Sequence, residues 1–112
     1  MKLYSGRRDR TGTCHVWVTE KGDSRELAPR LDLAAHSPTG FEWGYAGSGP
    51  AQLALAILVD ATGNDRIALR LHQRFKFERI ATLRREQDWS MTQEAVLAFV
   101  RDHADTLRGM TD

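Results

Sequence analysis

The feature that most constrains this sequence is an apolar run over residues 51–59, whose only polar member is Gln52. Pro50 stands directly before the run, and proline is favoured at the first position of a helix, where its missing N–H has no partner to lose. Ser48 or Gly49 is available as the N-cap. Because the run has no polar face, a helix here needs neighbours on every side. We therefore expect it to lie in the middle of the core.

Two further helices are expected after a stop at residues 60–64, where Gly and Asn are typical of a helix C-terminus. The first starts near Asp65, and its irregular step between Phe75 and Ile80 predicts a bend or a break. The second follows residues 90–93, which resemble a capping box. The apolar positions assigned to the two helices are Ile67, Leu71, Phe75, Ile80 and Leu83, and then Val96, Leu97, Phe99 and Val100.

Residues 2–8 and 13–20 predict a β-hairpin. Apolar and polar side chains alternate through the second segment, as in a half-buried strand. Residues 9–12, Asp-Arg-Thr-Gly, supply the turn. A second turn at residues 21–24 leads to a candidate third strand at residues 31–33.

Residues 36–50 are rich in Gly, Pro and Ser, yet they carry Phe41, Trp43 and Tyr45 at alternating positions. An extended backbone would place the three rings on one face. We expect an ordered loop that contains a short strand. Phe41 and Trp43 are assigned to the core, whereas Tyr45 can belong to the core or stack against a ligand.

Together these patterns predict one α+β domain over residues 1–112. A small antiparallel sheet, made of the N-terminal hairpin plus one or two short strands, packs on a buried central helix and two further helices. With 41% hydrophobic and 28% charged residues, the composition is that of a globular protein and argues against disorder or a membrane protein.

Charge and cysteine content narrow the function classes. The formal net charge of +1 gives no global field for nucleic acid or acidic lipid, so direct nucleic-acid binding is disfavoured. The single cysteine, Cys14, cannot form an internal disulfide or a zinc site alone. No signal peptide or membrane-spanning run is visible. These features predict a cytoplasmic protein.

The glycine-rich residues 44–50, which include Gly47, Ser48 and Gly49, run directly into the expected central helix. Such a loop can present unpaired N–H groups to a phosphate. It matches neither a Walker loop nor a dinucleotide fingerprint, and Pro50 removes one donor. A tight turn with an N-cap is the favoured interpretation, and an anion site is the alternative.

Arg7, Arg8 and Arg10 gather near the hairpin turn, where they can clamp a phosphate or an acidic partner or remain solvated. Arg7 and Arg8 are expected on opposite faces of the strand. The candidate ligand-binding set is Arg7, Arg8, Arg10, His36, Tyr45, Gly47, Ser48 and Gly49. Glu42 is expected to be solvated, with pairing to a hairpin arginine as the alternative.

No catalytic residues, metal ligands or cofactor motif are assigned. The four histidines are scattered, and no His or Cys pair has the short spacing of a zinc site. The neighbours His36 and Ser37 do not make a convincing base and nucleophile. Ser37 is expected to cap a turn, and His36 to hydrogen-bond to backbone.

The segments Tyr4-x-Gly6-Arg7-Arg8, HSPTGFEWGYAGSGPAQLALAIL and Trp89-x-Met91-Thr92 resemble a small uncharacterised bacterial family. Known as a domain of unknown function, it is carried on plasmids, phages and integrative elements. The resemblance covers nearly the whole chain and implies a context of host defence or counter-defence.

Two functions follow as expectations. The first is a non-enzymatic protein that binds a phosphate-bearing ligand such as a nucleotide signal. The second is a protein–protein inhibitor or adaptor of the anti-CRISPR type, which binds a host defence protein through arginines and aromatic residues. A symmetric homodimer is compatible with so small a domain, and no cofactor is expected.

Overall fold

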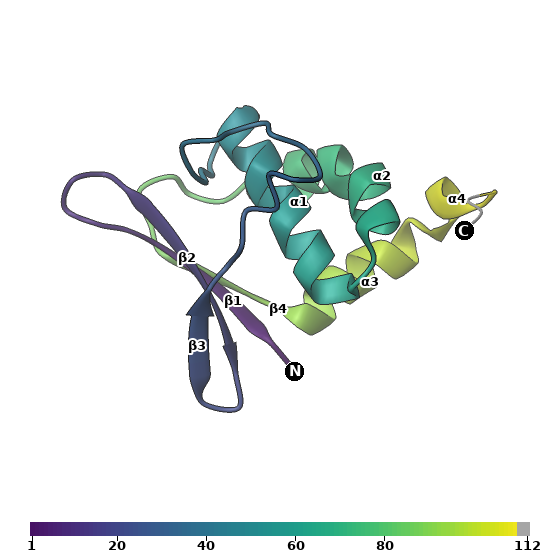
Figure 1. Ribbon diagram of the computed structural model, residues 1–112, viewed down its shortest axis with the longest axis horizontal. Helices are drawn as coiled ribbons and strands as arrows, with labels where there is room; N and C mark the ends of the chain where they lie inside the picture. Colours follow the sequence, from purple (N-terminus) through teal and green to yellow (C-terminus); the bar gives the residue numbers. More distant parts are fainter. Residues whose placement is uncertain (110–112) are drawn as a thin grey trace.

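A computed structural model describes residues 1–109, and residues 110–112 of the predicted domain lie outside the described residues. The fold is α+β, as predicted, with a four-stranded antiparallel sheet in the order β3-β2-β1-β4. The helices pack against one face of this sheet (Figure 1). The elements are β1 (Leu3–Arg8), β2 (Cys14–Glu20), β3 (Asp23–Glu26), α1 (Ser48–Thr62), α2 (Asp65–Phe75), the π-helix η1 (Lys76–Ile80), β4 (Trp89–Thr92), α3 (Gln93–Asp102) and α4 (Ala104–Leu107).

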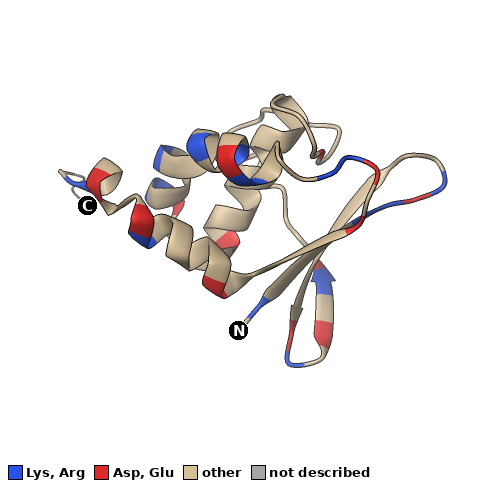
Figure 2. Cartoon of the chain, turned by 180° about the vertical axis from the view of Figure 1, so that it is seen from behind, with Lys and Arg blue, Asp and Glu red and all other residues tan. Residues whose placement is uncertain are grey.

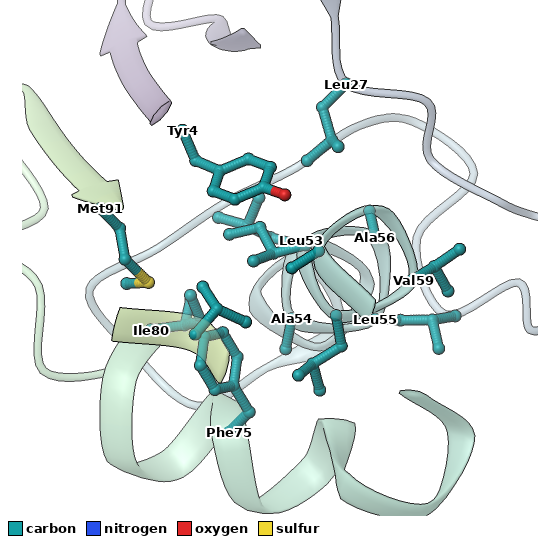
Figure 3. Packing of buried hydrophobic residues seen from close by; sticks show 14 of the residues in the cluster. Tyr4, Leu27, Leu53, Ala54, Leu55, Ala56, Val59, Phe75, Ile80 and Met91 are labelled. Atoms are coloured by element: carbon teal, nitrogen blue, oxygen red, sulfur yellow. The ribbon is translucent and has the colours of Figure 1, made fainter. Parts of the chain in front are cut away.

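Helix α1 occupies the centre of the core, which confirms the prediction from its apolar run. Every residue from 51 to 59 is buried. Figure 3 shows Tyr4 and Met91 of the sheet on one side of α1, and Phe75 and Ile80 on another. The helix stops at Gly63, whose φ of 65° is left-handed and whose N–H donates to the Val59 carbonyl.

The one polar residue of the 51–59 run, Gln52, is fully buried and holds a loop in place. Its Oε1 accepts from the backbone N–H groups of His36 at 2.8 Å and Ser37 at 3.1 Å. Its Nε2 donates to the Pro29 carbonyl at 2.6 Å. Gln52 therefore ties the segment between β3 and α1 to the core.

The predicted hairpin is confirmed as β1 and β2, with Val16 and Val18 buried between half-exposed neighbours. The third strand was misplaced: it is β3, and residues 31–33 form a turn. All four residues of β3 are exposed, so no apolar alternation marked it. Strand β4 was not predicted, because residues 90–93 resembled a capping box.

That capping box is wrong in detail. Thr92, and not Ser90, is the N-cap of α3, since its Oγ1 accepts from the Ala95 N–H at 3.1 Å. Gln93 instead accepts from the Lys2 N–H and donates to the Ala61 carbonyl, each at 3.0 Å. Ser90 lies in β4, and so the strand continues directly into the helix.

The expected irregularity after Phe75 is confirmed and has a defined form. Residues 76–80 form a π-helix, in which the Ala81 N–H donates to the Lys76 carbonyl at 2.8 Å. A π turn accommodates one more residue than an α turn. This extra residue brings Ile80 back to the buried side, where it is fully enclosed.

The short strand predicted within residues 36–50 is absent. Gly44 has a φ of 88°, which interrupts the extended run, and its N–H donates to the Ile80 carbonyl. The three rings consequently do not share an environment: Trp43 is fully buried, Phe41 is half-buried and Tyr45 is exposed.

Candidate functional site

The start of α1 differs from the prediction in a way that leaves backbone donors open. Ser48 is the first helical residue, Pro50 is the third, and the N-cap is Gly47. Glycine has no side chain, so no side-chain cap bond forms. Within residues 1–109, the amides of Ser48 and Gly49 have no hydrogen-bond acceptor.

A hollow of about 350 Å³ lies beside this helix start. Three segments line it: the hairpin turn, the loop before α1 and the first turn of α1. Its polar groups include the hydroxyls of Thr13, Thr39, Tyr45 and Ser48. The volume falls within the range of small-molecule sites, and the open amides belong to residues that line it.

Tyr45 lines this hollow and contacts an arginine that sequence reasoning missed, Arg85, which does not itself line the hollow. The Arg85 guanidinium lies 5.0 Å from the centroid of the Tyr45 ring, close enough for a cation–π contact. Arg85 is 40 positions from Tyr45 in the sequence. It comes near because Gly44, without a Cβ, allows the Arg85 backbone to approach.

Arg8 points into the protein and is fully engaged there. Its guanidinium makes a two-pronged pair with the Glu42 carboxylate, at 2.9 Å for each contact. It also donates to the carbonyls of Gly12 and Arg85, and it lies over the Trp43 ring at 5.2 Å. Pairing was the alternative predicted for Glu42, and the Arg8 hydrogen bonds lower the pKa of that carboxyl.

The other hairpin arginines do not join Arg8. Arg7 lies on the opposite face of the sheet, as predicted, with its guanidinium 5.3 Å from the Trp17 ring centroid. Arg10 is exposed in the hairpin turn. Neither lines the hollow. The structure therefore brings together Tyr45, Ser48 and Gly49 from the predicted set, with Gly47 beside them as the cap.

His36 faces away from this set, toward α2. Its Nε2 lies 3.0 Å from Nε2 of His72, so the partner of its ring is an imidazole and not the predicted backbone group. Ser37 does cap a turn, because its hydroxyl donates to the Gly40 carbonyl at 2.6 Å. Ser37 lines the hollow next to the histidine pair.

Cys14 also lines the hollow, but its thiol is poorly activated. Burial and the neighbouring Glu42 carboxylate raise the pKa of Cys14 to about 11. The thiolate is the reactive form, so alkylation by iodoacetamide at pH 7.5 should be roughly tenfold or more slower in the folded protein than in urea. Mass spectrometry of timed samples would measure both rates, and equal rates would contradict this environment for Cys14.

Basic and acidic residues alternate along the described part of the chain. Figure 2 shows basic and acidic residues interspersed along the strands and helices. No helix among residues 1–109 has both the length and the apolar character needed to span a bilayer.

The family model for a family of unknown function, DUF6166, matches residues 4–102 of the chain. The chain belongs to the DUF6166 family. The match spans both the hairpin and the hollow beside α1, so the DUF6166 domain includes the whole candidate site. No curated protein and no solved structure matches the chain.

Proposed function

We propose that this DUF6166 protein is a non-enzymatic binding protein that takes a small phosphate-bearing ligand in the hollow at the start of α1. The observation that carries the proposal is the pair of open amides, on Ser48 and Gly49, beside a hollow of about 350 Å³. Amides at a helix N-terminus and the helix dipole both favour an anion. The first turn of α1 contains no acidic residue that would compete.

The remaining groups suit a ligand with an aromatic part. Tyr45 is 40% exposed and offers a ring for stacking, and Arg85 supplies a cation beside it. Arg8 and Glu42 neutralise each other next to the hollow. The site therefore carries little net charge apart from Arg85, which favours a phosphate monoester or diester over a polyphosphate.

The resemblance to mobile-element proteins gives this chemistry a context. We propose a nucleotide signal of host defence as the ligand, which the protein would sequester. A protein carried on a plasmid or phage gains from such sequestration without needing a catalytic group.

The second candidate function is a protein–protein inhibitor or adaptor. It is favoured by the outer face of the sheet, where the ring centroids of Trp17 and His15 are 5.6 Å apart and the rings stack. The Arg7 guanidinium lies over the Trp17 ring. A shallow hollow of about 390 Å³ lies beside Trp17 and Arg7. Tryptophan and arginine are the residues most often found as interface hot spots.

A thermal-shift experiment with inorganic phosphate, nucleoside monophosphates, cyclic nucleotides and ATP tests the ligand proposal. A bound ligand should raise Tm, and the Tm should keep rising with its concentration. Ser48→Pro removes one amide at a helix position that tolerates proline. This variant should bind roughly 10-fold or more weakly, because a hydrogen bond to a charged group contributes about 1.5–3 kcal/mol.

Two controls accompany this experiment. Ser48→Ala removes the hydroxyl but keeps the amide, so it should bind more tightly than Ser48→Pro, and equal losses from the two variants would show that the amide contributes nothing. Trp17→Ala, on the outer sheet face, should also bind the ligand normally, and a loss there would favour the outer face as the site. If no phosphate compound raises Tm at millimolar concentration, the ligand proposal is wrong.

A further inference from the structure

We propose that His36 and His72 form a binding site for a divalent transition-metal ion of the kind that imidazole prefers, Ni²⁺, Cu²⁺ or Zn²⁺. The two Nε2 atoms face each other at 3.0 Å, one from the loop before α1 and one from α2. The site is separate from the ligand hollow and does not depend on the proposed function.

The orientation of His72 leaves its Nε2 lone pair toward His36. The Nδ1 atom of His72 lies 2.9 Å from the Leu69 carbonyl and 3.1 Å from the Ala68 carbonyl. A carbonyl only accepts hydrogen bonds, so Nδ1 carries the proton and Nε2 is bare. In the metal-free protein the Nε2–H of His36 therefore donates to this lone pair at 3.0 Å. When an ion binds, His36 carries its proton on Nδ1 instead and presents a second bare Nε2 to the ion. Histidines that bind metals commonly have this second contact, which fixes the tautomer and the ring.

The backbone of His36 and the ring of His72 are also held by contacts other than the one between the two rings. His36 is held through its backbone N–H by the buried Gln52, and His72 is 6% exposed on α2.

The separation of the two nitrogens matches metal–imidazole geometry. With bonds of about 2.0–2.1 Å, two nitrogens 3.0 Å apart subtend about 95° at the ion. This angle is close to that of square-planar or octahedral sites, which suit Ni²⁺ and Cu²⁺. A tetrahedral ion such as Zn²⁺ needs the nitrogens about 0.3 Å farther apart.

The remaining ligands would come from an amide and from solvent. Gln73 places its side-chain amide 3.4 Å from Nε2 of His72, and a 180° turn of that amide exchanges its nitrogen for its oxygen. Within residues 1–109 no three side chains of His, Cys, Asp or Glu gather around one point. Two imidazoles with one amide make this an exchangeable site that leaves positions for water.

Untagged full-length protein titrated with NiCl₂ tests the proposal by thermal shift. At a concentration about 100 times the Kd, Ni²⁺ should raise Tm by about 5 °C or more, and EDTA should reverse the rise. MgCl₂ should have no effect, because Mg²⁺ prefers oxygen ligands. His36→Asn should abolish the rise relative to its own metal-free Tm.

His15→Asn is the matched control. His15 pairs with Asp9 at 2.9 Å, away from His36, so this variant should keep the whole rise. Because His72 is buried and its variants can fail to fold, the wild type supplies a second measurement by NMR. Zn²⁺ should shift the Nε2 resonances of both His36 and His72. No rise in Tm with Ni²⁺, an undiminished rise in His36→Asn, or unmoved Nε2 resonances would each overturn the site.

Discussion

Asp60→Ala should lower the free energy of unfolding by about 2–4 kcal/mol, because it removes the acceptor that joins α1 to the sheet. The Asp60 carboxylate accepts from Lys2 at 3.1 Å, from the Tyr4 hydroxyl at 2.9 Å and from Arg25 at 2.6 Å. When the Asp60 carboxylate is removed, the side chains of Lys2 and Arg25 can turn to solvent. The Tyr4 hydroxyl belongs to a fully buried residue and would lose its partner.

The pH dependence of this contribution follows from the charge of Asp60. Burial alone would raise the pKa of Asp60, but hydrogen bonds from Arg25, Tyr4 and Lys2 outweigh burial and lower it. A carboxyl with a lowered folded pKa stabilises above its unfolded pKa of about 3.9 and loses that stabilisation as the pH falls through the folded value. The difference between wild type and Asp60→Asn should therefore be full at pH 7 and shrink below about pH 4.

Urea denaturation at pH 7 and pH 3 would measure both effects. Asp105→Ala is the matched control, since Asp105 pairs with Arg108 in an exposed position. Removal of such a pair should change stability by less than about 0.5 kcal/mol. Equal losses from the two variants at pH 7 would show that Asp60 does not link the layers.

Most of the fold could be predicted because its signals are local. The apolar run predicted the central helix, and the alternation around Val16 predicted the hairpin. The irregular step after Phe75 predicted the break that the π-helix makes. Strand β3 was not predicted because all its residues are exposed and show no apolar alternation. It is a strand because it pairs with β2. Strand β4 was not predicted because its pairing with β1 joins residues more than 80 positions apart in the sequence.

The candidate site was predicted only where its residues are neighbours in sequence. Tyr45, Ser48 and Gly49 lie within five positions and meet in the hollow. Arg8 was placed in the ligand-binding set, and the pairing of Glu42 with a hairpin arginine was only the alternative, because Glu42 lies 34 positions from Arg8. Arg85 and the pairing of His36 with His72 depend on tertiary approach, which no spacing in the sequence encodes.

Gly6→Ala should destabilise the protein by about 2–3 kcal/mol, although alanine in a strand is ordinarily better than glycine. A Cβ on Gly6 would overlap Nε1 of the Trp89 indole, and it would lie 2.7 Å from Cζ2 of that ring. Trp89 cannot withdraw easily, because it packs edge-on against the fully buried Trp43 at 5.6 Å. Arg8 in turn lies over Trp43, so a displaced indole would disturb the pair between Arg8 and Glu42.

Denaturant unfolding followed by tryptophan fluorescence would measure the Gly6→Ala effect, and two comparisons isolate its cause. At Gly12 an added Cβ would meet no heavy atom within 4 Å, but the backbone φ is 87°. Gly12→Ala should therefore lower the free energy of unfolding by only about 1 kcal/mol, the cost of a left-handed backbone. Trp89→Leu combined with Gly6→Ala should cost less than the sum of the two single changes, because the smaller side chain makes room for the methyl group. Strict additivity would mean that Gly6 serves the strand backbone and not the indole.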